Sequence, residues 1–75
     1  MDDEIVDLRG LKCPLPALFA RRALARAAAG RVLEVWADDP MAPVDIPHMC
    51  GAERYEVLDV IREKSFARFK LRRPA

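Results

Sequence analysis

The chain has 75 residues and a mass of 8.5 kDa, which is enough for one small domain, expected to span residues 1–75. Hydrophobic residues make up 52%, which excludes a disordered tail, and the longest apolar run, residues 14–20, is far too short to cross a membrane. The net charge is +1 and the first residues are acidic, where a secretory signal would be basic, so we expect a cytoplasmic protein without membrane contacts.

The small net charge hides segments of opposite sign. Residues 14–31 contain four arginines and no acidic residue, whereas residues 32–59 contain seven acidic residues and one arginine. Such blocks are either ordinary solvated faces or a basic surface for an acidic partner. The chain lacks the interleaved aromatic and basic residues that are typical of RNA binding, so we expect no direct nucleic-acid contact.

The chain is predicted to begin with a strand and a helix. Residues 5–9 alternate loosely and start with β-branched side chains, which favours a strand. Residues 15–29 are rich in Ala, Leu and Arg, which favour a helix, and Gly30 follows as its C-terminal residue. The apolar side chains of this helix recur at helical spacing and form one thin stripe, at Ala17, Ala20, Leu24 and Ala27.

A second strand and a short second helix are predicted to follow. Residues 31–37 alternate as a strand does, with one side formed by Leu33, Val35 and Ala37 and the other by Glu34 and Trp36. Prolines 40 and 43 interrupt the pattern. The second helix is expected to start at Asp45, as a cap or first-turn acid, and to end between Gly51 and Arg54.

Two strands are predicted to close the chain, over residues 56–63 and 66–72, with a tight turn between them. Alternation in the last strand predicts that its inward side is formed by Ala67, Phe69 and Leu71. The order is therefore β-α-β-α-β-β. A βαβ unit makes the first two strands parallel, and the last two form an antiparallel hairpin. We predict an α/β fold, a two-layer α/β sandwich in which both helices cover one face of a four-stranded mixed sheet.

Cys13 has the most distinctive chemical setting in the chain. It precedes the predicted first helix at the N-cap position, and Pro14 and Pro16 set the start of that helix. The positive end of a helix dipole favours a thiolate, which is the reactive form of cysteine. From the residues alone, Cys13 is a reactive thiol, a cysteine packed under the helix or a metal ligand. With one His and two Cys in the chain, the composition discourages a metal site.

The other candidate groups carry weaker signals. Cys50 is either a small core residue of the second helix or a resolving cysteine for Cys13, if the two come close enough to bond. His48 is expected to be a solvated surface residue rather than a catalyst. No general base is conspicuous in the sequence.

Residues 10–16 (GLKCPLP) resemble the CPxP signature of the TusA-type, SirA-like sulfur-carrier proteins. The resemblance continues through residues 38–40 (DDP), residues 45–47 (DIP) and the closing residues 69–72 (FKLR). It covers nearly the whole chain, with the elements in the same order. The combination of these motifs at these separations is much more specific than CPxP alone.

The resemblance implies a cytoplasmic sulfur carrier or sulfurtransferase without a cofactor. Cys13 would take a sulfane sulfur as a persulfide from a cysteine desulfurase or a rhodanese-like protein and hand it to an acceptor protein. The family serves tRNA thiolation, molybdenum cofactor maturation and sulfur oxidation. Four cationic residues are candidates for docking a partner: Lys12, Arg21, Arg22 and Arg26. The alternative function is a non-catalytic regulatory or protein-interaction module on the same fold.

The sequence departs from the family at one position. Family members often place a glycine shortly before the third strand, whereas Arg54 fills that position here and Gly51 directly follows Cys50. The length of the second helix is therefore left open.

Overall fold

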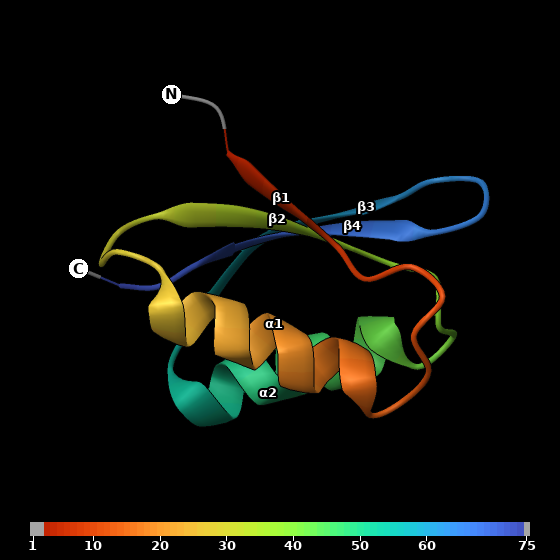
Figure 1. Ribbon diagram of the computed structural model, residues 1–75, viewed down its shortest axis with the longest axis horizontal. Coiled ribbons are helices and arrows are strands. Elements are labelled where there is room, and N and C mark those ends of the chain that lie inside the picture. Colours follow the sequence, from red (N-terminus) through yellow and green to blue (C-terminus); the bar gives the residue numbers. More distant parts are fainter. Residues whose placement is uncertain (1–2, 75) are drawn as a thin grey trace.

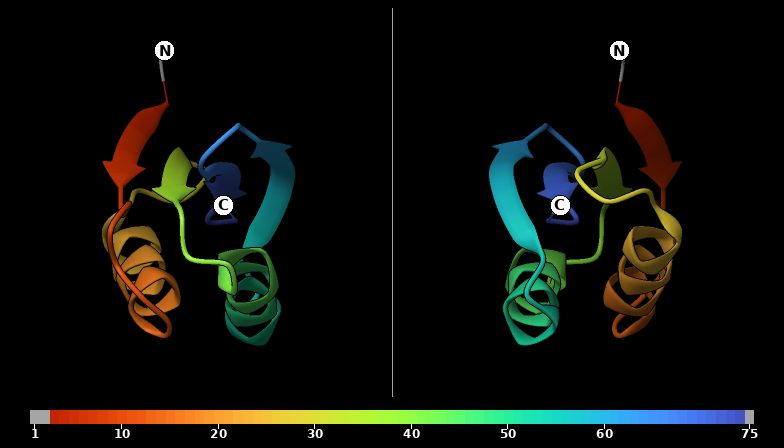
Figure 2. Two further views of the ribbon diagram at one scale, coloured as in Figure 1. Left: turned by 90° about the vertical axis from the view of Figure 1, so that its right-hand side faces the viewer. Right: turned by 90° about the vertical axis from the view of Figure 1, so that its left-hand side faces the viewer.

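The computed structural model describes residues 3–74 and consists of a four-stranded sheet and two helices (Figure 1). The elements in chain order are β1 (Glu4–Asp7), α1 (Leu15–Arg26), β2 (Val32–Ala37), α2 (Ala42–Glu53), β3 (Glu56–Arg62) and β4 (Ala67–Arg72). Both helices lie on the same face of the sheet, as the end-on views in Figure 2 show. The predicted two-layer sandwich is confirmed. Neither helix in the described part of the chain is long and apolar enough to cross a membrane.

The sheet has the strand order β1-β2-β4-β3. β1 and β2 are parallel, as the α1 crossover requires, and β4 pairs antiparallel with both β2 and β3. The predicted parallel pair and the predicted hairpin are therefore confirmed. β4 takes a central place because alternate side chains along it are buried, whereas β3 is mostly exposed and forms an edge.

The core lies between the sheet and the helices. Its largest fully buried side chains come from every element except β1 and β3, at Phe69, Leu24, Leu33, Ile46, Leu71, Val35, Pro16 and Cys50. The inward sides predicted for β2 and β4 are buried as expected. Ala20 of α1 is also fully buried, and its small side chain lets the helix pack closely.

α1 ends earlier than the sequence predicts. It stops at Arg26 rather than at Ala29, and Ala27 already has an extended backbone. The Arg73 guanidinium, at the far end of the chain, donates hydrogen bonds to the carbonyl oxygens of Ala25 (3.1 Å) and Ala27 (2.8 Å). These carbonyls would otherwise lack partners at the helix end. A tertiary contact therefore satisfies this helix terminus in place of the local signal at Gly30.

α2 begins before the predicted position, at Ala42 rather than at Asp45. The Asp39 carboxylate accepts a hydrogen bond from the Met41 N–H (3.1 Å), and the Asp39 carbonyl accepts one from the Ala42 N–H (3.0 Å). Pro43 falls in the first turn, where a missing N–H leaves no bond unmade, so it does not stop the helix. Asp45 consequently lies within the first turn of α2.

α2 ends at a residue in the left-handed conformation. Arg54, the C-cap residue, has a φ of +62°, and the next N–H, from Tyr55, bonds the Cys50 carbonyl at 2.8 Å. This arrangement favours glycine, because a side chain strains a left-handed backbone. The glycine that the resemblance leads us to expect near this position would adopt this backbone without strain.

Arg54→Gly is therefore expected to raise the free energy of unfolding by about 0.5–1 kcal/mol, since the relief of strain exceeds the extra freedom of glycine in the unfolded chain. Urea denaturation followed by circular dichroism measures the change. Ala25→Gly, at an exposed helical position of α1, is the matched control and should lower stability by about 0.5–1 kcal/mol. A loss of stability in Arg54→Gly would contradict the argument.

Candidate functional site

Cys13 lies in the loop that joins β1 to α1, at the end of the molecule where both helices begin (Figure 1). Gly10, with a φ of +88°, turns the chain into this loop, and its N–H donates to Asp38 Oδ1 at 3.0 Å. The Leu15 N–H closes the other end of the loop on the Lys12 carbonyl at 2.8 Å. The Cys13 side chain is exposed and carries a free thiol.

The partner of the Cys13 thiol is on the other helix. Pro14, not Cys13, is the N-cap residue of α1, and Pro16 is buried in the first turn. The thiol donates a hydrogen bond to Asp45 Oδ2, in the first turn of α2, at a distance of 3.0 Å. The prediction that Cys13 caps α1 is therefore wrong, although both prolines lie at the start of that helix as expected.

This contact reverses the expected effect on the Cys13 thiol. The hydrogen bond to Asp45 raises the pKa of Cys13 above its ordinary value of 9.0, and partial desolvation and the negative charges of Asp45 and Asp39 act in the same direction. A carboxylate that accepts the thiol proton stabilises the neutral form, and like charges disfavour the thiolate. The site therefore favours the thiol form of Cys13, whereas a position at the start of α1 predicts that the thiolate is favoured.

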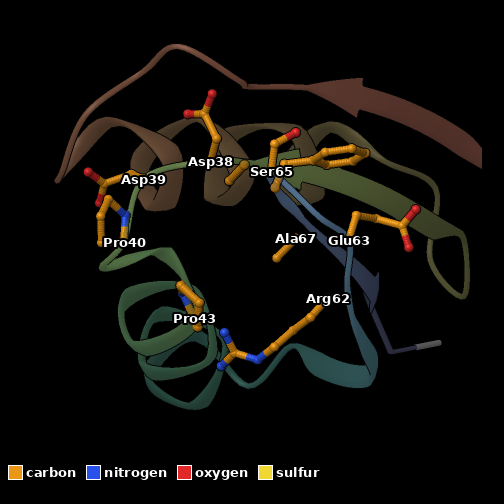
Figure 3. Close-up of a pocket in the computed structure, with 10 residues that line it drawn as sticks. Asp38, Asp39, Pro40, Pro43, Arg62, Glu63, Ser65 and Ala67 are labelled. Carbon is orange, nitrogen blue, oxygen red and sulfur yellow. The ribbon is translucent and has the colours of Figure 1, made fainter.

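The loop that precedes α2 is acidic. Asp38 anchors Gly10, and Asp39, only 8% exposed, holds the start of α2. Both residues also line a pocket of about 220 Å³ between this loop and the β3–β4 hairpin, and Figure 3 shows Arg62 and Glu63 on the hairpin side. Three of these four charged lining residues are acidic, so the pocket adds to the negative field at this end of the molecule.

Asp45 is the functional candidate that sequence reasoning missed. The sequence around Asp45 predicts only the start of the second helix, and Asp45 lies 32 positions from Cys13. The available signal was its place in the DIP motif, which accompanies CPxP in the resembling family. Only the side-by-side arrangement of the two helix starts brings the motifs into contact (Figure 2).

The four cationic candidates are exposed, but the structure does not gather them around the thiol. Lys12 is next to Cys13 in the loop. The arginines follow α1 away from the site at exposed positions, at Arg21, Arg22 and Arg26. Arg21 lies 3.8 Å from Glu53 of α2, in an exposed ion pair.

Cys50 is a core residue and His48 is a surface residue, which are the structural roles expected for them. Cys50 is fully buried in the core, and burial raises the pKa of its thiol to about 11. His48 is exposed on α2. Cys50 would have to leave the core to reach Cys13, and both cysteines are free. Among residues 3–74, no three His, Cys, Asp or Glu side chains are grouped so that they could hold a metal ion.

The fold and the site define a small α/β protein that presents one thiol between its first strand and first helix and buries the other. The family described as "Sulfurtransferase TusA" matches residues 4–73, which is nearly the whole chain. The chain belongs to the TusA family.

Curated relatives agree with this assignment. A "Putative sulfur carrier protein" of Neisseria meningitidis serogroup A is 46% identical over 59 residues, which cover 79% of this chain and 80% of the relative. One from Thermotoga maritima is 40% identical over 55 residues, covering 73% and 70%. The crystal structure of a SirA-like protein from Desulfitobacterium hafniense matches with a TM-score of 0.79 over 95% of this chain and 97% of that chain. At 22% identity, this last likeness shows the fold alone.

Proposed function

We propose that this chain is a sulfur carrier, in which Cys13 accepts a sulfane sulfur as a persulfide and passes it to an acceptor protein, with residues 1–75 acting as a single domain. The observation that carries the proposal is the exposed Cys13 thiol in a TusA-family chain whose other cysteine is buried. The names of the relatives in Neisseria and Thermotoga support the same role.

The proposed transfer is an exchange between a thiol and a persulfide. Cys13 Sγ attacks the outer sulfur of the donor persulfide, and the bond between Sγ and that sulfur forms as the S–S bond of the donor breaks. The donor sulfur leaves with the electron pair and takes up a proton, which balances the proton lost by Cys13. The exchange therefore consumes no oxidant, reductant or metal ion. Transfer of the sulfur from Cys13 to the acceptor is the same exchange, with Cys13 Sγ as the leaving group.

The partners must bring their own sulfur to Cys13. We infer a cysteine desulfurase or a rhodanese-like protein as the donor and a downstream sulfur-acceptor protein as the recipient. Exposed apolar side chains on or beside the first turns of the two helices support docking at this end, at Leu15, Leu18, Met41 and Val44.

Intact mass spectrometry tests the proposal directly. The protein is incubated with a cysteine desulfurase and cysteine, or with inorganic polysulfide, and its mass is measured without reductant. We expect a gain of about 32 Da, the mass of one sulfur atom, that a reducing agent removes. A chain that takes up no sulfur from either source would instead be the non-catalytic interaction module considered above.

Partner docking through α1 gives a second expectation. Reversing two charges, with Arg21→Glu and Arg22→Glu together, should slow sulfur transfer from a cysteine desulfurase about tenfold at low salt and make the rate less dependent on salt. Alkylation of Cys13 by neutral iodoacetamide should not change. Arg31→Glu, beyond the other end of α1, is the control and should leave the transfer rate near that of the wild type. An unchanged rate at low salt in the double variant would show that these arginines are only a solvated face.

A further inference from the structure

The carboxylate that contacts Cys13 opposes the release of a group bonded to its sulfur. Asp45 Oδ2 lies 3.0 Å from Sγ, and this contact is made between two elements that are distant in the chain. In thiol exchange, a sulfur leaves more slowly when its thiolate is harder to form. A negative charge beside Sγ has this effect. The negative charge of the Asp45 carboxylate therefore slows the departure of Sγ from any disulfide or persulfide that Cys13 forms.

The same charge acts on the group that attacks. The attacking species in exchange is a thiolate, which is an anion. The charged groups that face the thiol are Asp45 from α2 and Asp39 from the preceding loop. The loop of the thiol carries two exposed cations, Lys12 and Arg9, and Arg9 is paired with Asp7. The two carboxylates therefore leave the approach to Sγ negative. An attacking sulfur with a cationic group beside it is favoured there over one with a carboxylate.

We propose that Asp45 is a positioning residue that retains sulfur on Cys13 and selects the thiol that removes it. Its carboxylate slows the departure of Sγ, repels anionic thiols, and fits an acceptor protein that presents a Lys or Arg side chain beside its own cysteine. The inference rests on the proposed function for the identity of the bound sulfur. The effect of Asp45 nevertheless applies to any group bonded to Sγ.

The step itself balances without another reactant. The attacking thiolate bonds to the outer sulfur, the bond between that sulfur and Sγ breaks, and Sγ leaves with the electron pair. Sγ then takes a proton from water and donates it in the hydrogen bond to Asp45. The carboxylate keeps its charge throughout, so it acts through its position beside the sulfur.

The test uses a bound group that does not depend on persulfide chemistry. Cys13 is converted to its methyl disulfide and treated with one of three thiols: thioglycolate, which is anionic, 2-mercaptoethanol, which is neutral, or cysteamine, which is cationic. Intact mass separates the two routes, because attack at the outer sulfur yields unmodified protein and attack at Sγ yields protein that carries the probe. For each probe, the rate of attack at the outer sulfur in Asp45→Asn is divided by the same rate in the wild type. This ratio cancels the intrinsic reactivity of the probe.

At low salt we expect this ratio to be about ten for thioglycolate, about three for 2-mercaptoethanol and about one or less for cysteamine. The thioglycolate and cysteamine ratios should approach that of the neutral probe at high salt, because salt screens the charges. Asp45→Glu, which keeps the charge, should restore the wild-type order. Glu53→Gln removes the same charge from the other end of α2 and should leave all three rates unchanged.

A pH profile gives a second readout that a purely structural role would not move. In Asp45→Asn, alkylation of Cys13 by iodoacetamide should rise at lower pH than in the wild type, because the carboxylate that raises the pKa of the thiol is gone. Circular dichroism checks that the variant is folded. If Asp45→Asn does not fold, the test is made on the wild-type protein. Its rate with cysteamine divided by its rate with thioglycolate must then fall as salt is added.

Equal ratios for the three probes would overturn the inference, as would an alkylation profile that does not move. Neither result bears on the proposed function. That function fails on different evidence, if the wild type takes up no sulfur from a donor although it still forms and exchanges the methyl disulfide.

Discussion

Replacing Cys13 with serine is expected to abolish sulfur loading and to leave the fold intact. A hydroxyl cannot form a persulfide, and the remaining thiol, Cys50, is fully buried in the native protein. The fold should tolerate the change because Cys13 is exposed and packs little of the core. The serine hydroxyl can also donate to Asp45 Oδ2 in place of the thiol, so the contact between the two helix starts is preserved.

Intact mass after treatment with a cysteine desulfurase and cysteine measures the loss, and circular dichroism checks the fold. Cys50→Ala is the matched control, since it removes the other thiol and should load sulfur as the wild type does. This control should be less stable because it leaves a small cavity beside α2. Loading of Cys13→Ser to the wild-type extent would move the carrier role away from Cys13.

Phe69→Ala is expected to lower the free energy of unfolding by about 3–5 kcal/mol. Phe69 is the largest fully buried side chain and lies on the central strand β4, between β2 and β3. A domain of this size has a small total stability, on the order of 5 kcal/mol. The variant should therefore retain only about 0–2 kcal/mol and be partly unfolded at room temperature, although Phe69 is not part of the proposed site.

Urea denaturation measured by circular dichroism gives the comparison. Phe19→Ala removes the same side chain from α1, where Phe19 is 38% exposed, and should cost about 1 kcal/mol or less. If the two variants lose similar stability, β4 is not the centre of the core as described.

Some features followed from the sequence alone because they depend only on local periodicity. A strand places alternate side chains on opposite faces, so the pattern of residues 66–72 was sufficient to predict which side of β4 is buried. The Ala- and Leu-rich stripe of α1 was predicted for the same reason. Cys13 stood out because a cysteine beside two prolines at a helix start is an unusual chemical setting, and the nearby motifs linked it to a family.

Other features required the tertiary structure because they join residues that are far apart in the chain. Arg73 decides where α1 ends, and the turn at Asp39 lets α2 begin before Asp45. The direction of the Cys13 pKa shift was predicted wrongly for the same reason. Proximity to the start of α1 suggested a lowered pKa, whereas the carboxylate that sets it comes from α2. Electrostatic interactions depend on distance in space, so only the packing of the two helices determined the chemistry of this thiol.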